Sequence, residues 1–288
     1  MSDPSASAAS SSTASTSRYQ PSREEVAEQW LFTEEDLEYT PTVLAGILKP
    51  AEERKARRRG VGLIYKVAER SQLHSHVLHT AALFFHRFFF RRIMRPPGFP
   101  SLYSGQRTYV YQDIAIAALY LASKVEEGYR KLDDIVSIAC QVEPGRVGSG
   151  LEEGESEEAV LKNGVLAGEE ILLAALCFDL IVEHPQKQLI VAARKLGVEI
   201  ELLRCAYANM HDAFRDPICT FFEAPVLAAG VFALACEDAE VDPTTYMAAS
   251  DDMSNVVGLT WLETFDVSEE EVEGEPAKGR EETCCTNH

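Results

Sequence analysis

One lysine stands at the end of a helix that is otherwise apolar. The stretch AIAALYLASKVEE, residues 115–127, contains no charge before Lys124, and Glu126 and Glu127 follow it. A lysine in this position can lay its stem along apolar surface and keep its ammonium in water. Alternatively, the ammonium can offer three hydrogen-bond donors to a partner. The rest of the sequence bears on this choice.

Other side chains with chemical potential do not form a recognisable site. His74, His76 and His79 lie close together, but only the last two share a helix face, and no acidic or cysteine ligand accompanies them. The seven cysteines form no CxxC pair and the first five lie in apolar surroundings, which predicts buried free thiols in a reducing compartment. Phosphate-binding loops and hydrolase motifs are missing from the sequence. We therefore expect a binding protein without a metal or cofactor, not an enzyme.

Composition narrows the class of partner. The net charge of −19 argues against a chain whose main work is to grip nucleic-acid phosphates. No run of 18 apolar residues is present, so we expect no membrane span. Two basic runs, residues 53–59 and 87–95, are typical of solvated helix faces, with nuclear import or partner binding as the alternative. We expect disorder in the Ser-rich residues 1–27 and in the acidic tail, residues 268–288.

The helix that carries Lys124 has a second copy. Ala117-Ala118 matches Ala228-Ala229 at an offset of 111 residues, which places Ala235 opposite Lys124. A second pair of landmarks, Phe178-Asp179 and Phe265-Asp266, is offset by 87 residues. The first copy therefore holds about 24 extra residues, which we assign to a mobile loop in the Gly- and Glu-rich segment 141–168. Because the second copy forms the same helix without a cation, packing does not explain the lysine.

Helical periodicity dominates the chain from residue 50 onward, so the predicted fold class is all-α. We expect two tandem five-helix repeats: residues 28–182, with a lead-in segment, and residues 183–267. The helices expected in the first repeat are 51–70, 75–93, 109–127, 130–141 and 166–178. Those expected in the second repeat are 185–196, 199–214, 224–237, 243–250 and 255–265.

Several of these segments resemble a known family. ASKVEE at the end of a buried helix, FFHRFFF on the preceding helix and CFDLIVEHP at the close of the first repeat are similar to the cyclin fold. HRF, EHP and the lead-in QWLFTEEDLEYTPTVLAGI resemble the transcriptional cyclins, the K type first and the T and L types next. The resemblance runs from about residue 28 to residue 270 and implies that the two repeats are cyclin boxes.

The resemblance also implies a function and a site. Cyclins of this kind bind and activate a cyclin-dependent kinase, here one that phosphorylates the RNA polymerase II C-terminal repeats in the nucleus. In the family, a lysine at the end of the third helix and a glutamate at the start of the fifth form the central polar pair of the kinase interface. The lysine matches Lys124, and the glutamate matches Glu169, or Glu170 beside it. The predicted kinase-binding residues also include Glu127, His86 and Arg57.

Two features of the sequence separate this chain from other proteins with the same fold. Cell-cycle cyclins carry an aspartate where this chain has His86, and Arg57, Arg58 and Arg59 occupy the region of their hydrophobic substrate-docking motif, so docking of Arg-x-Leu ligands is not expected. The alternative function is a scaffold of the transcription factor IIB type that binds DNA or polymerase without a kinase. That class shows a basic face and an N-terminal zinc ribbon, and this acidic chain without a CxxC pair lacks their sequence signals.

Overall fold

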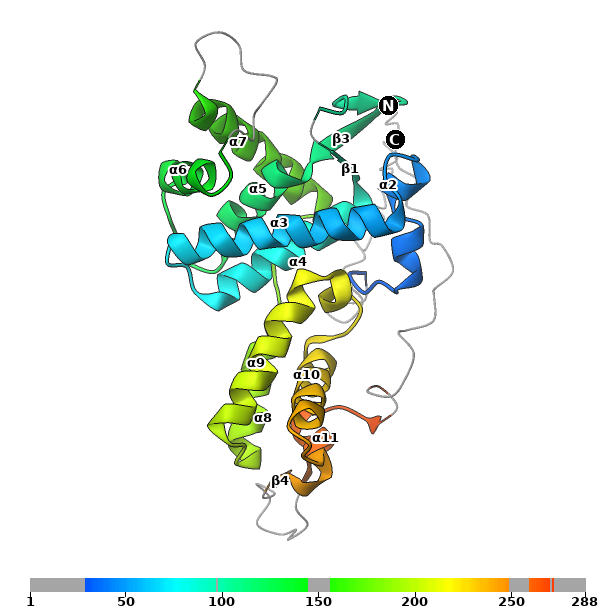
Figure 1. Cartoon of the computed structure of the whole chain (residues 1–288), viewed down its shortest axis with the longest axis vertical. Coiled ribbons are helices and arrows are strands. Elements are labelled where there is room, and N and C mark those ends of the chain that lie inside the picture. The colour runs from blue at the N-terminus through cyan, green and yellow to red at the C-terminus, as the bar shows by residue number, and fades with distance from the viewer. Residues whose placement is uncertain (1–28, 97, 145–155, 249–258, 270, 272–288) are drawn as a thin grey trace, which may run out of the picture. The chain divides into compact units, whose positions relative to one another are not determined.

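Helices form most of the structure, a computed structural model that describes residues 29–96, 98–144, 156–248, 259–269 and 271. Figure 1 shows the first repeat in blue to green and the second in yellow to orange. The predicted tail 1–27, nearly all of the predicted tail 268–288 and the centre of the predicted loop lie outside these residues. The predicted all-α class is confirmed, with short strands in two places.

A short lead-in precedes the first repeat. It contains a 3-10 helix, Glu35–Glu38, and the helix α2, Pro41–Leu44. The helices of the first repeat are α3 (Pro50–Arg70), α4 (Ser75–Arg91), α5 (Tyr111–Val125), α6 (Leu132–Val142) and α7 (Glu157–Ala175). Between α4 and α5 lies a three-stranded sheet of order β1-β3-β2, built from β1 (Ile93–Arg95), β2 (Leu102–Tyr103) and β3 (Gln106–Val110).

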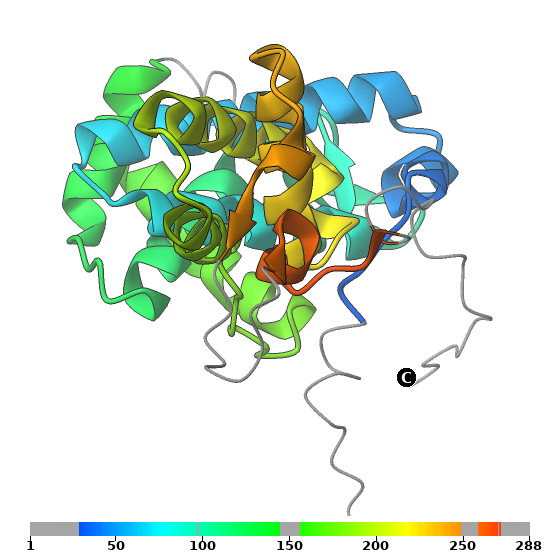
Figure 2. The same cartoon turned by 90° about the horizontal axis from the view of Figure 1, so that it is seen from below.

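The second repeat contains α8 (Pro185–Leu196), α9 (Ile200–Arg215), a 3-10 helix Pro217–Thr220, α10 (Ala224–Asp238) and α11 (Trp261–Phe265). Figure 2 shows α8, α9 and α10 packed together, and contacts join α10 to both neighbours. Pro185 occupies the first turn of α8, where its missing N–H costs nothing. Gly197 ends α8 with a φ of 66°, a conformation that glycine adopts without strain.

Helix α5 is the centre of the first repeat. It contacts α3, α4, α6 and α7, which explains why its sequence is apolar on nearly every side. The approach of α7 depends on Gly168, because a Cβ there would lie only 3.0 Å from the Cβ of Ala117. This contact fixes the rotation of α7 against α5, and so determines which of the α7 residues point outward.

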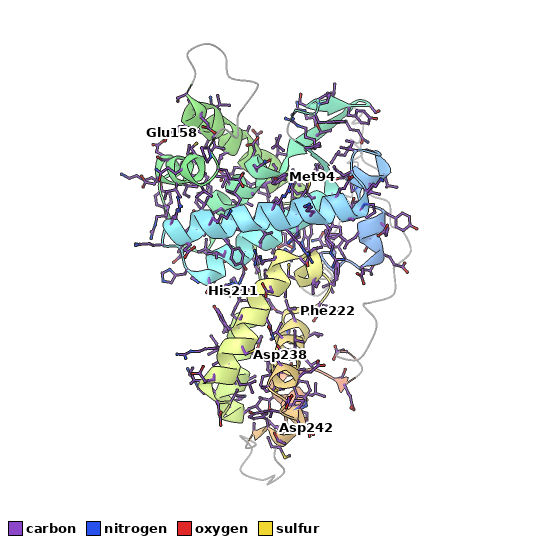
Figure 3. The ribbon with its side chains drawn as sticks, viewed as in Figure 1. Met94, Glu158, His211, Phe222, Asp238 and Asp242 are labelled. Atoms are coloured by element: carbon purple, nitrogen blue, oxygen red, sulfur yellow. The ribbon has the colours of Figure 1, made fainter. Side chains whose placement is uncertain are left out.

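The predicted loop 141–168 is wrong in its second half. Helix α7 begins at Glu157, and the Oγ of Ser156 caps it by accepting a hydrogen bond from the Ala159 N–H at 3.2 Å. Glu157 and Glu158, the latter labelled in Figure 3, lie in the first turn, where negative charge is favourable to the helix dipole. The acidic composition that suggested a loop is therefore the signature of a helix N-terminus.

The predicted helix 243–250 is also wrong. The chain there forms a 3-10 turn, Pro243–Thr245, followed by β4 (Met247–Ala248), which pairs with β5 (Leu259–Thr260). The side chain of Asp242 accepts hydrogen bonds from both the N–H and the hydroxyl of Thr244. Such local bonds compete with helix formation. The last helix begins at Trp261 rather than 255, after a capping box formed by Thr260 and Glu263.

The repeats meet where α9 contacts α3 and α4. Arg58 of α3 forms an ion pair with Asp216, which follows α9. His211, labelled in Figure 3, faces His79 of α4, with 3.0 Å between the two ring nitrogens. Polar contacts of this kind define how the two sets of helices are aligned.

Candidate functional site

Lys124 and Glu169 meet on the outside of the α5–α7 pair. Lys124 lies in the last turn of α5, and its ammonium forms an ion pair with the Glu169 carboxylate of α7. The ammonium also lies 4.3 Å from the centre of the Tyr120 ring, within the range of a cation–π contact. The side chain of Lys124 is 34% exposed and that of Glu169 14%. The predicted pairing is therefore present, and the lysine remains accessible while its partner is mostly covered.

The surface around this pair is partly apolar. Leu166, Glu169, Glu170 and Leu173 follow one another at helical spacing along α7, with Glu169 at the edge of the buried stripe and Leu166 and Glu170 turned away from it. Leu166 is 47% exposed and Glu170 is also exposed. An exposed leucine beside a partly covered ion pair is typical of a protein-binding surface, because such surfaces combine apolar area with a few charged contacts.

The structure corrects the residue that corresponds to Lys124 in the second repeat. Helices α5 and α10 both end in a turn whose last residue has a positive φ of 55°, namely Glu127 and Glu240. Superposing these ends pairs buried Ala122 with buried Ala235, and places exposed Glu237 opposite Lys124. The predicted match to Ala235 was displaced by two residues. The two repeats thus carry opposite charges at this position.

The second landmark moves by the same two residues. Leu176 and Phe265 are both buried, and each is followed by a residue with positive φ, Cys177 and Asp266. Each of the two offsets therefore increases by two residues, and the difference between them does not change. This is why the predicted length of the insertion was right although both pairings were shifted.

Glu126 is a positioning residue that sequence reasoning did not single out. Its carboxylate accepts a hydrogen bond from the Thr80 hydroxyl of α4 at 2.7 Å and one from His184 Nε2 at 3.2 Å. His184 immediately precedes α8, so Glu126 joins the end of α5 to α4 and to the start of the second repeat. Glu127, which was predicted as a contact, is exposed one residue further on. The signal available in the sequence was the acidic pair after Lys124.

Arg57 and His86 are not surface residues. Both are fully buried, so neither can touch a docked partner while the helices pack in this way. Arg57 forms an ion pair with Glu53 at 2.7 Å and donates to the His86 carbonyl at 3.0 Å. The hydroxyl of Thr40 donates to the same glutamate. The prediction that Arg57 and His86 bind a kinase is corrected: they hold helices together.

The ring of His86 extends this buried network to the second repeat. Burial, with the charge of Arg57 as a smaller cause, lowers the pKa of His86 to about 3. The ring is therefore neutral near pH 7, and its Nε2–H donates to the carbonyl of Phe214 at 3.2 Å. The pKa of His79 is also lowered, by burial first and by neighbouring His211 second.

The described residues contain no cluster of three histidine, cysteine or acidic side chains suited to a metal ion. Within the same residues, no helix is long and apolar enough to cross a membrane. The predicted burial of the cysteines holds for Cys219 and Cys236. It fails for Cys177, which is exposed and accepts a hydrogen bond from Arg91.

Comparison with known proteins identifies the family of this chain. Residues 29–181 match the family model described as the cyclin N-terminal domain, which is more than half of the chain. The chain belongs to the cyclin family. This result confirms the predicted resemblance.

Similar cyclins include the K and T types. Cyclin pch1 of Schizosaccharomyces pombe is 31% identical over 248 residues, which cover 85% of this cyclin and 66% of the relative. Human cyclin-K is 31% identical over 214 residues, 72% of this cyclin and 33% of the relative. Cyclin-T1-5 of Arabidopsis thaliana is 30% identical over 270 residues, 91% and 42% of the two chains. This cyclin therefore spans between a third and two thirds of the length of these relatives.

A solved structure shares the fold. A chain in the crystal structure of the yeast RNA Pol II CTD kinase CTDK-1 complex aligns with a TM-score of 0.61 and 16% identity, over 84% of this cyclin and 69% of that chain. The arrangement of both helical repeats is thus one that other proteins adopt at very low sequence identity.

Proposed function

We propose that this cyclin is the regulatory subunit of a cyclin-dependent kinase and docks on it through the outer face of α5 and α7. The observation that supports this most directly is the Lys124–Glu169 pair. It lies beside exposed Leu166, and the second repeat forms the equivalent of α5 without it. The pair is therefore not needed for packing, and a partner is the simplest reason for it.

The pair has a clear task at an interface. The ammonium has three donors, of which one serves Glu169. The other two can bond backbone carbonyls at the end of a kinase helix. Glu169 holds the lysine in one orientation, which reduces the entropy lost on docking. This cyclin positions the docked kinase helix, and the kinase itself carries out phosphoryl transfer.

The proposed substrate is the C-terminal repeat of RNA polymerase II, and the proposed location is the nucleus. The relatives of the K and T types and the fold shared with a chain of an RNA Pol II CTD kinase complex support this choice. The net charge of −19 agrees with protein partners rather than direct DNA binding.

Titration calorimetry with a purified kinase tests the proposal. Removing one partner of a hydrogen-bonded charge pair at an interface costs roughly 2–5 kcal/mol, so Lys124→Ala should weaken binding by about thirtyfold or more. Lys187→Ala, on exposed surface of α8, is the matched control and should bind like the parent. A folded Lys124→Ala protein that binds and activates the kinase normally would remove this face from the interface.

A further inference from the structure

A pocket of about 320 Å³ opens beside the first half of α3, far from Lys124. Ala56 and Met94 provide part of its apolar lining, and Met94, labelled in Figure 3, is completely buried. Tyr111, the first residue of α5, also lines the pocket, whereas Lys124 lies thirteen residues along that helix. At 1.5 Å per residue the two places are about 20 Å apart, so they can be occupied at the same time.

The charged residues of this pocket are mostly cationic. Lys55, Arg59 and Arg95 line it, against a single carboxylate, that of Glu52. Glu52 is already engaged, because it accepts a hydrogen bond from the Lys49 N–H at 3.0 Å and so caps α3. In the described part of the chain, neither Lys55 nor Arg59 has a carboxylate partner. Three cations around one pocket are unusual in a chain of net charge −19, and they favour an anionic ligand.

The three cations are held in place to different degrees. Lys55 and Arg59 are four residues apart and therefore share one face of α3. Arg95 belongs to β1, which pairs with β3, and its Nη1 donates to the carbonyl of Phe99 at 2.6 Å. Its Nε is buried and has no hydrogen-bond partner among the described residues. A buried donor left unpaired costs about 1–3 kcal/mol, and the positive charge of this guanidinium attracts an anion in the pocket.

We infer that this pocket binds a phosphorylated segment of a peptide. A phosphoryl group carries up to two negative charges and three acceptor oxygens, which suits a lysine and two arginines. An apolar side chain next to it would contact Leu48 and Ala56. A long nucleic acid fits less well, because its many phosphates would meet the acidic remainder of the surface.

The use of such a site rests on the proposed function. A kinase that phosphorylates a repeated sequence produces peptides that still contain unmodified repeats. A regulatory subunit that holds the phosphorylated repeat raises the effective concentration of the next one at the active site. The pocket would therefore favour successive phosphorylation of one substrate molecule.

Fluorescence anisotropy with this cyclin alone tests the pocket without any kinase. The probe is a labelled two-repeat peptide of the RNA polymerase II C-terminal domain with one phosphoserine, compared with its unphosphorylated form. We expect the phosphorylated peptide to bind at least tenfold more tightly. Arg59→Glu should weaken that binding at least tenfold, and the charge-matched control Lys187→Glu should change it less than twofold. Circular dichroism verifies that both variants are folded.

Three outcomes would overturn the inference. These are equal binding of the two peptides, normal binding by folded Arg59→Glu, and displacement of the peptide by inorganic phosphate at the peptide's own concentration, which would assign the pocket to free phosphate. Failure of the proposed function is distinguishable, because Lys124→Ala should bind the phosphopeptide normally and Arg59→Glu should bind the kinase normally. A protein that binds phosphopeptide but no kinase would keep the pocket and remove its proposed use.

Discussion

Helices α5 and α10 occupy equivalent positions in their repeats but differ at their outer ends. Both are apolar and central, and both end in a glutamate with positive φ. Beside α5 lies α7, a helix of 19 residues that brings Glu169 to Lys124, whereas α11 beside α10 has only five residues. The position that holds Lys124 in one repeat holds Glu237 in the other. The features that both repeats share, an apolar central helix and its terminal turn, are those that packing requires. The Lys124–Glu169 pair occurs in one repeat, and we assign it to partner binding.

The largest expected effect concerns the core of the first repeat. Arg57→Ala leaves Glu53 buried without its cation, and breaking a buried pair in this way costs roughly 3–5 kcal/mol of unfolding free energy. The exposed Arg204–Glu201 pair of α9 gives the control, because Arg204→Ala should cost about 1 kcal/mol or less. Denaturant unfolding measures both. Replacing both charges, as Glu53→Leu with Arg57→Met, should recover part of the loss.

The second prediction tests the charge difference directly. Exchanging the pair, as Lys124→Glu with Glu169→Lys, preserves an ion pair on the surface, so the unfolding free energy should change by less than about 1 kcal/mol. Kinase binding should nevertheless fall by about thirtyfold or more, since the accessible charge is now negative. If the exchanged protein bound the kinase like the parent, the sign of the charge at residue 124 would be irrelevant to docking.

The third prediction concerns the contact between the repeats. His86 titrates at about 3 when folded and at 6.5 when free, so the unfolded chain binds more protons between these values. Stability therefore rises with pH through this window and falls as the pH is lowered. His86→Gln keeps a neutral donor for Phe214 but cannot titrate, so its loss of stability between pH 6 and pH 5 should be smaller by roughly 1 kcal/mol. Parallel pH profiles of parent and variant would contradict this account.

The fourth prediction concerns the connection between α6 and α7. Replacing residues 145–155 by a short Gly/Ser linker should change the unfolding free energy by about 0.6 kcal/mol or less, because loop closure depends weakly on length. Extending the deletion to Lys162 also removes the Ser156 cap and buried Leu161, and should cost several times more. Equal melting temperatures for the two deletions would mean that the start of α7 does not contribute to the fold.

The smallest effect is expected in the second repeat. Glu237→Lys places a cation where α5 has one, but among the described residues no long partner helix brings a glutamate opposite it. Stability should stay within about 0.5 kcal/mol, as for an ordinary surface substitution, and kinase binding should not change. A gain of kinase binding by this variant would show that the lysine alone, without its partner helix, is sufficient.

Periodicity was sufficient to predict most helices, because apolar residues that recur every three to four positions mark one face of a helix. It failed at the start of α7, because the acidic first turn with Glu157 and Glu158 has a composition that is also typical of loops. It also failed to decide burial. Arginine and histidine are usually exposed, and only the fold shows that Glu53 and the Phe214 carbonyl satisfy Arg57 and His86.

The pairing of Lys124 with Glu169 rather than Glu170 could be predicted by counting from a resemblance, but not from chemistry, since adjacent glutamates are alike. Glu126 escaped notice for a similar reason. Its two hydrogen bonds reach residues 46 and 58 positions away, and no local pattern reveals such distant partners.

The close approach of α7 to α5 at Gly168 has a practical consequence. The angular setting of Glu169 is fixed by its immediate neighbour Gly168, where even one methyl group would lie only 3.0 Å from the Cβ of Ala117. An exposed residue of α7 that points away from the pair, such as Asn163, is thus a suitable place to attach a fluorophore. Such a label would sit on the same helix pair as the docking face, and so could report kinase binding without disturbing the residues that mediate it.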